Sequence, residues 1–268
     1  MSQGEVSTKT GTTGSAAPAT KVAVLSFFFP AHNEEANLEA LVEEALATLP
    51  LLAEKYEIIA VDDGSKDRTP ALADELASRH PEVFRVVHHP TNLGYGAALR
   101  SGFRASRYDL IAFIDGDRQF KVIDVGRLTE RMAAADSPDV VVGYRLKRAD
   151  PAIRRWYARI YRLANRTFFG VRVRDIDCAC KLFKRPALEP ISVSSGGAFF
   201  TAELLIKLRF EGRRIAEVGV PHYSRTAGSP TGAKPSVVFR AVHDFWSLRF
   251  RLWVSRSDGM CRGEKILG

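Results

Sequence analysis

Short apolar runs alternate with amphipathic stretches from Val22 onward, and this pattern predicts strands separated by helices. Buried parallel strands read as continuous apolar runs. The segments of this kind are residues 22–29, 56–62, 83–89, 109–115 and 140–145. Because stretches of helical length separate most of them, the pattern predicts an α/β fold with a mainly parallel sheet flanked by helices.

The predicted helices begin at recognisable signals. Asn33 is a candidate cap for a helix that runs to Leu49, and Thr69 followed by Pro70 is typical of a second helix start. A glycine-containing turn at 94–96 opens a third helix. Further helices are expected in the second half of the chain, at residues 151–170, at 200–211 and after Gly232.

Three regions follow from the pattern. Residues 1–20 are small and polar without periodicity, which predicts a disordered tail. Residues 21–235 form the α/β domain. Residues 236–268 form a C-terminal amphipathic helix and tail, in which large apolar side chains alternate with arginine. Such a helix either lies at a lipid surface or packs on the domain.

Composition limits the class of protein. The 268 residues are 46% apolar and 26% charged, as in ordinary globular proteins. Three cysteines argue against a disulfide scaffold. The longest apolar runs are shorter than the roughly 20 residues that span a bilayer, and no signal-peptide pattern opens the chain. We therefore expect a protein of the cytoplasm or of the cytoplasmic face of a membrane.

The net charge of +8 is concentrated in one segment. Residues 144–185 hold thirteen Lys or Arg and three Asp. This basic run is either a solvated face or a surface for an anionic substrate, an anionic membrane or nucleic acid. We expect no nucleic-acid partner, because no known reader motif is present and such a function would leave the acidic strand ends unexplained.

Acidic residues follow three of the predicted strands, at the edge where parallel sheets bind ligands. They are Glu34, the pair Asp62 and Asp63, and the pair Asp115 and Asp117. Two carboxylates at a spacing of two residues in extended chain lie on one side and repel each other. Mg²⁺ or Mn²⁺ would relieve that repulsion and leave positions open for a diphosphate. Taken singly, each cluster also fits a turn or a helix cap.

The segments FFPAHNEEANLEALV, IIAVDDGSKDRT, NLGYGAALRSGF and IAFIDGDRQF resemble family 2 glycosyltransferases, which have the Rossmann-like GT-A fold. The later segments VVVGYR, DIDCACKLFKR, AFFTAELLIKL and HYSRTAGSPTG are similar to the dolichyl- or polyprenyl-phosphate mannosyl- and glucosyltransferase branch. The resemblance extends over residues 22–234.

The resemblance implies a role for individual residues. The nucleotide-sugar would contact Pro30, Glu34, Asp62, Asp63, Asp115 and Asp117. The metal, Mg²⁺ or Mn²⁺, would be held by Asp115, Asp117 and Gln119. The acceptor phosphate would face Arg145, Arg162 and Arg225, the last on a closing loop with Gly228. Asp117 and Arg145 are the residues implied in catalysis.

The implied activity is an inverting, metal-dependent transfer of mannose or glucose, from GDP-mannose or UDP-glucose to polyprenyl phosphate, at the cytoplasmic membrane face. Residues 177–180 and 230–232 depart from the usual pattern of this branch on its acceptor side. A family 2 enzyme that acts on a soluble glycan or a small metabolite therefore stays open. A catalytically inactive nucleotide-binding scaffold is the remaining alternative.

Overall fold

A seven-stranded sheet forms the centre of the molecule, in the order β3-β2-β1-β4-β6-β5-β8. The computed structural model describes residues 21–146, 152–225, 235–254 and 264–267. The strands are β1 (Val22–Ala31), β2 (Ala53–Asp62), β3 (Phe84–His88), β4 (Leu110–Phe113), β5 (Val140–Arg145), β6 (Lys181–Lys184) and β8 (Ile215–Val220). Only β6 runs antiparallel to its neighbours in this sheet, so the predicted mainly parallel sheet is confirmed.

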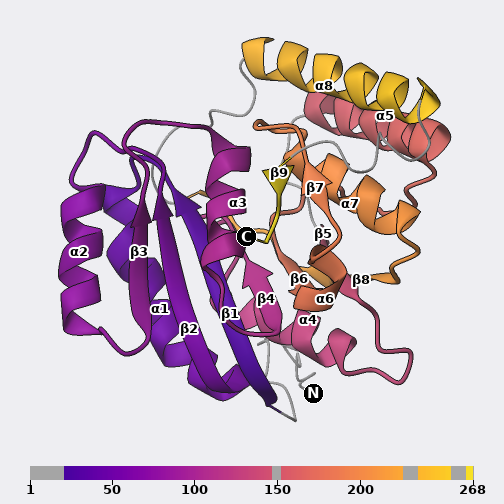
Figure 1. Cartoon of the computed structure of the whole chain (residues 1–268). Helices are drawn as coiled ribbons and strands as arrows, with labels where there is room; N and C mark the ends of the chain where they lie inside the picture. The colour runs from indigo at the N-terminus through magenta and orange to yellow at the C-terminus, as the bar shows by residue number, and fades with distance from the viewer. Residues whose placement is uncertain (1–20, 147–151, 226–234, 255–263, 268) are drawn as a thin grey trace, which may run out of the picture.

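Helices flank this sheet, and a second pair of strands stands apart from it (Figure 1). The helices are α1 (Glu35–Leu52), α2 (Thr69–Arg79), α3 (Tyr95–Ala105), the 3-10 turn η1 (Val122–Asp124), α4 (Val125–Met132), α5 (Ala152–Phe169), α6 (Arg185–Leu188), α7 (Phe200–Phe210) and α8 (Pro235–Val254). The small sheet pairs β7 (Ser192–Val193) with β9 (Glu264–Lys265). The tail predicted at 1–20, Gly228 and residues 230–232 lie outside the described residues.

The predicted helix start at Thr69 and Pro70 is confirmed, but neither Asn33 nor Thr69 is the capping residue. Asn33 has a φ of 57° and its side chain accepts a hydrogen bond from the Lys66 backbone N–H, while α1 begins after Glu34. Thr69 is already inside α2, and its side chain accepts a hydrogen bond from the Glu34 backbone N–H. Both side chains therefore join the loop after β1 to the loop after β2, and this long-range use has no local signal in the sequence.

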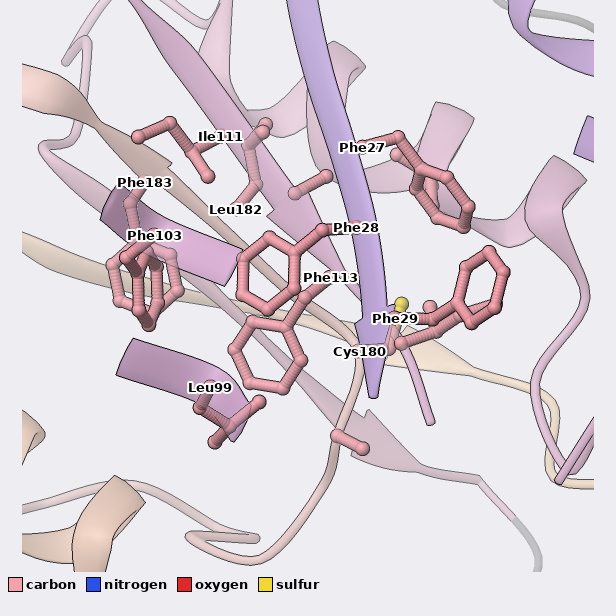
Figure 2. Close-up of a cluster of buried hydrophobic side chains, with 14 of the residues drawn as sticks. Phe27, Phe28, Phe29, Leu99, Phe103, Ile111, Phe113, Cys180, Leu182 and Phe183 are labelled. Carbon is pink, nitrogen blue, oxygen red and sulfur yellow. The ribbon is translucent and has the colours of Figure 1, made fainter. Parts of the chain in front are cut away.

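Alternation along β1 divides its aromatic side chains between the two faces of the sheet. Phe28 packs against Phe103 of α3 and Phe113 of β4, with ring centroids 5.0 and 5.3 Å apart. Phe27 and Phe29 point to the other face (Figure 2). All of these rings are fully buried. Each face of β1 thus carries its own apolar layer, as a central strand covered on both faces requires.

The chain order places a switch point beside β1. From β1 the chain steps outward to β2 and β3, and it then returns across β1 to β4. Right-handed crossovers accordingly put α1 and α2 on one face and α3 on the other. Ligands of open α/β sheets bind where the strand order reverses, beyond the carboxyl ends of the strands. Here that place lies after β1 and β4.

Helix α8 packs along α5 (Figure 1). Phe245 of α8 contacts Phe169 and Phe199, with ring centroids 4.9 and 6.0 Å apart, and Leu248 is fully buried. The described residues contain no helix of the length and apolarity that a bilayer crossing requires. One face of the predicted C-terminal helix is therefore packed on the domain.

Replacing Gly102 with alanine should destabilise the protein by about 1–3 kcal/mol, because a Cβ there would lie 2.2 Å from the Phe28 ring in a closely packed layer. In an uncrowded helix the same change would stabilise by about 1 kcal/mol. Urea unfolding measures the difference. Gly196→Ala is the control, since the nearest atom to its Cβ position lies 4.0 Å away and its φ is outside the left-handed region. An unchanged or raised stability of the Gly102 variant would contradict this packing.

Candidate active site

Two acidic side chains that follow β4 meet a basic side chain beyond the switch point. Asp115 and Asp117 follow β4, and the segment after β8 brings Arg225 back to them. An Arg225 guanidinium N–H donates to Asp117 Oδ2 at 2.6 Å. The hydroxyl of Tyr95, at the start of α3, donates to Asp115 Oδ1 at 2.9 Å. Each carboxylate thus has one strong donor from another element.

Close backbone packing holds this segment against β1. A Cβ on Gly116 would lie 2.6 Å from the carbonyl oxygen of Pro30, so only glycine fits between the two aspartates. The next residues leave regular geometry, since Arg118 has a φ of 58°. Non-glycine residues with such φ values are uncommon and cluster at functional sites. Pro30 thereby sets the position of the Asp115–Asp117 segment.

Asp115 titrates far from its ordinary range. Burial, and next the charge of Asp117, raise its pKa from 3.8 to about 7, against the opposing effects of Tyr95, Lys181 and Arg225. Asp115 and Asp117, called the acidic rim below, thus lie where burial and like charge both disfavour two ionised carboxylates. At pH 7 a proton is bound to Asp115 in a substantial fraction of molecules.

Glu34 belongs to the same electrostatic group. Burial raises its pKa, the hydrogen bond from the Asn37 amide opposes the shift, and the charge of Asp117 adds to it. That hydrogen bond is 2.6 Å long and orients the Glu34 carboxylate from within the first turn of α1. The structure thus brings Glu34, Asp115 and Asp117 together, as expected from the convergence of strand ends.

Asp62 and Asp63, at the end of β2 beside β1, both form hydrogen bonds within the protein. The Asp63 carboxylate accepts hydrogen bonds from the backbone N–H groups of Leu93 and Gly94 at 2.9 Å, and it contacts His89 at 2.7 Å. It therefore anchors the turn that opens α3. Burial would raise the pKa of Asp62, but its hydrogen bonds from Ser65 and His88 outweigh that effect and lower it.

Gln119 joins the acidic rim to the segment that carries Arg225. Its side-chain amide donates to the Tyr223 carbonyl at 3.3 Å, and its backbone carbonyl accepts from the Tyr223 N–H at 3.0 Å. Its own backbone N–H donates to Asp117 at 3.1 Å. In this structure Gln119 thus orients Asp117 and Arg225 relative to each other.

The three arginines implied for the acceptor phosphate have three different settings. Arg145 donates two hydrogen bonds to Asp175, at 2.6 and 2.8 Å, and this contact outweighs burial and raises its pKa. Arg162 donates to the carbonyl of Arg174 at 3.3 Å. Arg225 binds Asp117.

A buried lysine lies below the rim. Lys181 of β6 is 1% exposed and donates to the carbonyl of Cys178. Burial lowers its pKa, while the nearby acidic groups Asp175, Asp177 and Asp115 act in the opposite direction. A cation here offsets part of the charge of both the Asp115 and the Asp175 neighbourhoods.

The residues at the rim fit a divalent cation. Their donors are carboxylate oxygens, which Mg²⁺ and Mn²⁺ prefer. Two carboxylates two residues apart are also a pair whose repulsion a cation would relieve. Within the described residues no group of three or more His, Cys, Asp or Glu could hold a metal ion. The remaining ligands would therefore come from a diphosphate and water, as is usual for Mg²⁺.

Three residues of this site were not anticipated from the sequence: Tyr95, Asp175 and Lys181. Tyr95 stands in a turn that drew attention for its glycines alone. Lys181 is the first residue of the short strand β6, which has lysine at both ends and does not read as an apolar run, and Asp175 precedes that strand. The signal that could have identified them is charged residues in or beside a short apolar segment, because charged side chains are rarely buried without a partner.

The family model "Glycosyl transferase family 2" matches residues 26–192. The chain is 34% identical over 205 residues to undecaprenyl-phosphate 4-deoxy-4-formamido-L-arabinose transferase of Pseudomonas aeruginosa, and this match covers 76% of the chain but only 59% of that relative. It is 29% identical to dodecaprenyl-phosphate galacturonate synthase of Rhizobium johnstonii, covering 91% of the chain and 72% of the relative. These relatives are polyprenyl-phosphate sugar transferases.

Solved structures share the fold. Glucosyl-3-phosphoglycerate synthase of Mycobacterium tuberculosis superposes with a TM-score of 0.68 at 23% identity, over 84% of this chain and 79% of that one. Another structure of that enzyme, bound to Mn²⁺, UDP and glucosyl-3-phosphoglycerate, gives a TM-score of 0.66. The identity is low, so this likeness establishes the GT-A arrangement of the sheet and helices alone.

Replacing Asp115 with asparagine should stabilise the metal-free protein, increasingly so from pH 4 to pH 7. The carboxyl has a pKa of about 7 in the folded state against 3.8 without its environment. The folded state therefore retains a proton that the unfolded state releases, and the wild type loses stability as the pH rises through this window. The advantage of the variant should level off above pH 7.

Urea unfolding in the presence of a chelator measures this trend. Asp136→Asn is the control with the opposite sign, because the hydrogen bond from Arg131 lowers the pKa of Asp136 and stabilises the folded state above pH 4. A pH-independent difference between wild type and the Asp115 variant would show that this carboxyl is not buried beside Asp117.

Proposed function

The chain belongs to glycosyl transferase family 2, and we propose that it transfers a hexose from a nucleotide-sugar to a polyprenyl phosphate. Mannose from GDP-mannose and glucose from UDP-glucose are the proposed donor pairs. The chain spans 59% of the length of the first relative, so the whole activity of that protein is carried over only as part of this proposal. Both relatives described above are named for a polyprenyl phosphate.

The observation that carries the proposal is the Asp115–Asp117 pair at the switch point, with Glu34 and Arg225 beside it. A nucleotide-sugar needs a cation at its diphosphate, a polar contact for its nucleoside and an open position for the sugar. Burial and the charge of Asp117 both raise the pKa of Asp115, to about 7. The two carboxylates would attract a divalent cation, and the cation would in turn bind the diphosphate.

On the donor side, Asp115, Asp117 and Gln119 would hold Mg²⁺ or Mn²⁺. When bound, the ion stabilises the charge that develops on the departing nucleoside diphosphate. Glu34 would accept hydrogen bonds from the ribose hydroxyls. Its fixed orientation by Asn37 supports that role.

Pro30, Asp62 and Asp63 complete the proposed nucleoside site. Pro30 lies against Gly116 at the end of β1. Asp62 pairs in register with Ala31 of β1 and with His88 of β3, so its backbone lies at the same sheet edge. Since the Asp63 carboxylate already holds the Gly94 turn, its contribution to base recognition would be to shape that turn.

On the acceptor side, Arg145, Arg162 and Arg225 would attract the lipid phosphate. A phosphate oxygen attacks the anomeric carbon, and the bond from that carbon to the diphosphate oxygen breaks. The acceptor phosphate is already ionised at pH 7, so the step needs no strong general base. Attack from the side opposite the leaving group inverts the anomeric configuration. Asp117 and Arg145 are the residues proposed to act in this step.

The exposed face of α8 supports attachment to the cytoplasmic face of a membrane, where a polyprenyl phosphate would be met. Phe239, Trp246 and Phe250 recur at helical spacing and are 78%, 53% and 63% exposed. They border a shallow groove on α8. A helix with large apolar side chains outward and arginine beside them suits the boundary between headgroups and acyl chains.

Asp117→Asn should lower transfer by about 100- to 1,000-fold, since it removes a charge that holds the cation and the departing diphosphate. The assay incubates the protein with Mg²⁺ or Mn²⁺, polyprenyl phosphate and radiolabelled nucleotide-sugars, and it counts label in the organic phase. Asp136→Asn is the matched control, because Asp136 is an exposed aspartate that pairs with Arg131. Label that appears only in water-soluble products would contradict a lipid acceptor.

Trp246→Glu with Phe250→Glu should reduce binding to vesicles by more than about tenfold, because burial of one large apolar side chain contributes about 1.5–3 kcal/mol. Flotation on vesicles that contain phosphatidylglycerol measures the bound fraction. The control is Leu51→Glu with Phe210→Glu, two side chains of similar exposure, 48% and 49%, on other helices. Equal losses in the two double variants would overturn the assignment of α8 to the membrane.

A further inference from the structure

A groove lined by arginine lies beside α5. Its volume is about 530 Å³. Val171 and Val173 are buried side chains of the segment that forms one wall. The basic residues that line the groove are Arg159, Arg162, Arg166, Arg172 and Arg174, and Glu217 is its one acidic residue.

This concentration of positive charge is poorly balanced within the described residues. Arg159, Arg166 and Arg172 form no ion pair there. Glu217 accepts a hydrogen bond from the backbone N–H of Arg174 at 2.6 Å, and the Arg174 guanidinium lies 4.6 Å from the Tyr144 ring centroid.

Three of the arginines also repel one another along α5. Arg159, Arg162 and Arg166 are spaced by three and four residues, so they are neighbours on one helix face. Like charges at this spacing destabilise a helix. The groove therefore keeps a local repulsion that an anion between the guanidinium groups would relieve.

The groove adjoins the exposed side of α5, and α8 lies on the far side of that helix. At 3.6 residues per turn, Leu163 and Ile160 come next around α5 from the arginine face, and Phe168 lies opposite it. Leu163 and Ile160 are 63% and 45% exposed. Phe168 contacts Trp246 of α8, with ring centroids 5.3 Å apart, and the two helices run side by side in Figure 1. An exposed apolar strip thus connects the groove with the outer face of α8.

We propose that this groove binds the phosphate of an anionic phospholipid headgroup in the membrane on which α8 docks. The apolar strip favours a lipid over a free anion, because Leu163 lines the groove itself and would meet acyl chain while the guanidinium groups meet phosphate. The inference rests on the membrane attachment in the proposed function, and it adds the class of lipid that the enzyme selects.

The groove is distinct from the Arg145 neighbourhood. Arg174 is exposed and lines the groove, whereas the adjacent Asp175 is buried and binds Arg145. The backbone of these two residues therefore lies between this wall of the groove and Arg145. Arg162 lines the groove and also belongs to the proposed acceptor machinery, so the test leaves it unchanged.

The test compares two triple variants with the same loss of charge. Arg159→Gln, Arg166→Gln and Arg172→Gln change the groove. Lys55→Gln, Arg79→Gln and Arg107→Gln change exposed basic residues near the starts of β2, β3 and β4, at the other end of the strands. Vesicle sedimentation measures the apparent Kd for phosphatidylglycerol vesicles and for phosphatidylcholine vesicles.

The groove variant should bind phosphatidylglycerol vesicles about 100-fold more weakly, since a basic residue near an anionic surface contributes about 1 kcal/mol. The control variant should change by less than about threefold, because its charges lie beyond a Debye length of about 8 Å from the surface. Binding to phosphatidylcholine through α8 should persist in both. Arg172→Gln alone, at an exposed position, should show a smaller loss in the same direction.

If both triple variants bind phosphatidylglycerol vesicles equally more weakly than the wild type, the effect is one of net charge and the proposal is overturned. The proposal is also overturned if neither variant binds these vesicles more weakly. Inorganic phosphate provides a further arm. If inorganic phosphate binds the wild type more tightly than the groove variant while both bind phosphatidylglycerol vesicles equally, the groove is a site for free anions rather than for a headgroup. A loss of vesicle binding in the groove variant supports the headgroup.

Transfer to a short-chain polyprenyl phosphate in detergent separates this inference from the proposed function. Both triple variants should keep wild-type activity there. Loss of activity in the groove variant alone would make the groove part of the acceptor site and overturn the inference. If the wild type itself transfers no sugar, the proposed function fails, while the comparison of vesicle binding still decides the role of the groove.

Discussion

The mutual repulsion of Asp115 and Asp117 is the constraint on which the rest of the site depends. Strand β4 ends at Phe113, so both carboxylates emerge at the switch point, and the pKa of Asp115 rises to about 7 by burial and by the charge of Asp117. The local contact is a hydrogen bond from the Gln119 backbone N–H to Asp117. The partners that oppose the rise in pKa come from elsewhere: the Tyr95 hydroxyl from α3, Lys181 from β6 and Arg225 from the segment after β8. The sheet order brings these elements together.

Close backbone packing and the hydrogen bonds of Asp63 position the turn that carries Tyr95. A Cβ on Gly64, which has a φ of +64°, would lie 2.2 Å from the backbone of Thr91, so the turn after β2 packs directly on the turn before α3. Asp63 then accepts the N–H of Gly94 from the same turn. The acidic residues after β2 therefore build the platform on which Tyr95 reaches Asp115, and they act on the rim through another residue.

The sequence predicts the parts of this site that arise from strand ends. Apolar runs locate β1, β2 and β4, and parallel pairing requires their ends to share an edge, so Glu34, Asp62 and Asp115 could be expected together. Lys181 and Asp175 could not, because β6 is a four-residue antiparallel insertion with no apolar run of its own. The Asn33 and Thr69 caps failed for a related reason. Their side chains bind another loop, and that contact exists only after the strands have paired.

The basic run at residues 144–185 is continuous in the sequence, but its side chains have different environments in the folded chain. Arg145 is neutralised by Asp175, Lys181 is buried below the acidic rim, and Arg185 donates to the carbonyl of Tyr108. Arg159, Arg162 and Arg166 of α5 remain on the surface with Arg172 and Arg174, beside apolar side chains that are also exposed. Because the buried members of the run already have internal partners, the net charge of the run is larger than the positive charge that it exposes on the surface. The exposed arginines repel one another, and an external anion can relieve this repulsion. The groove is therefore suited to attachment to a membrane, and the acidic rim to the transfer reaction.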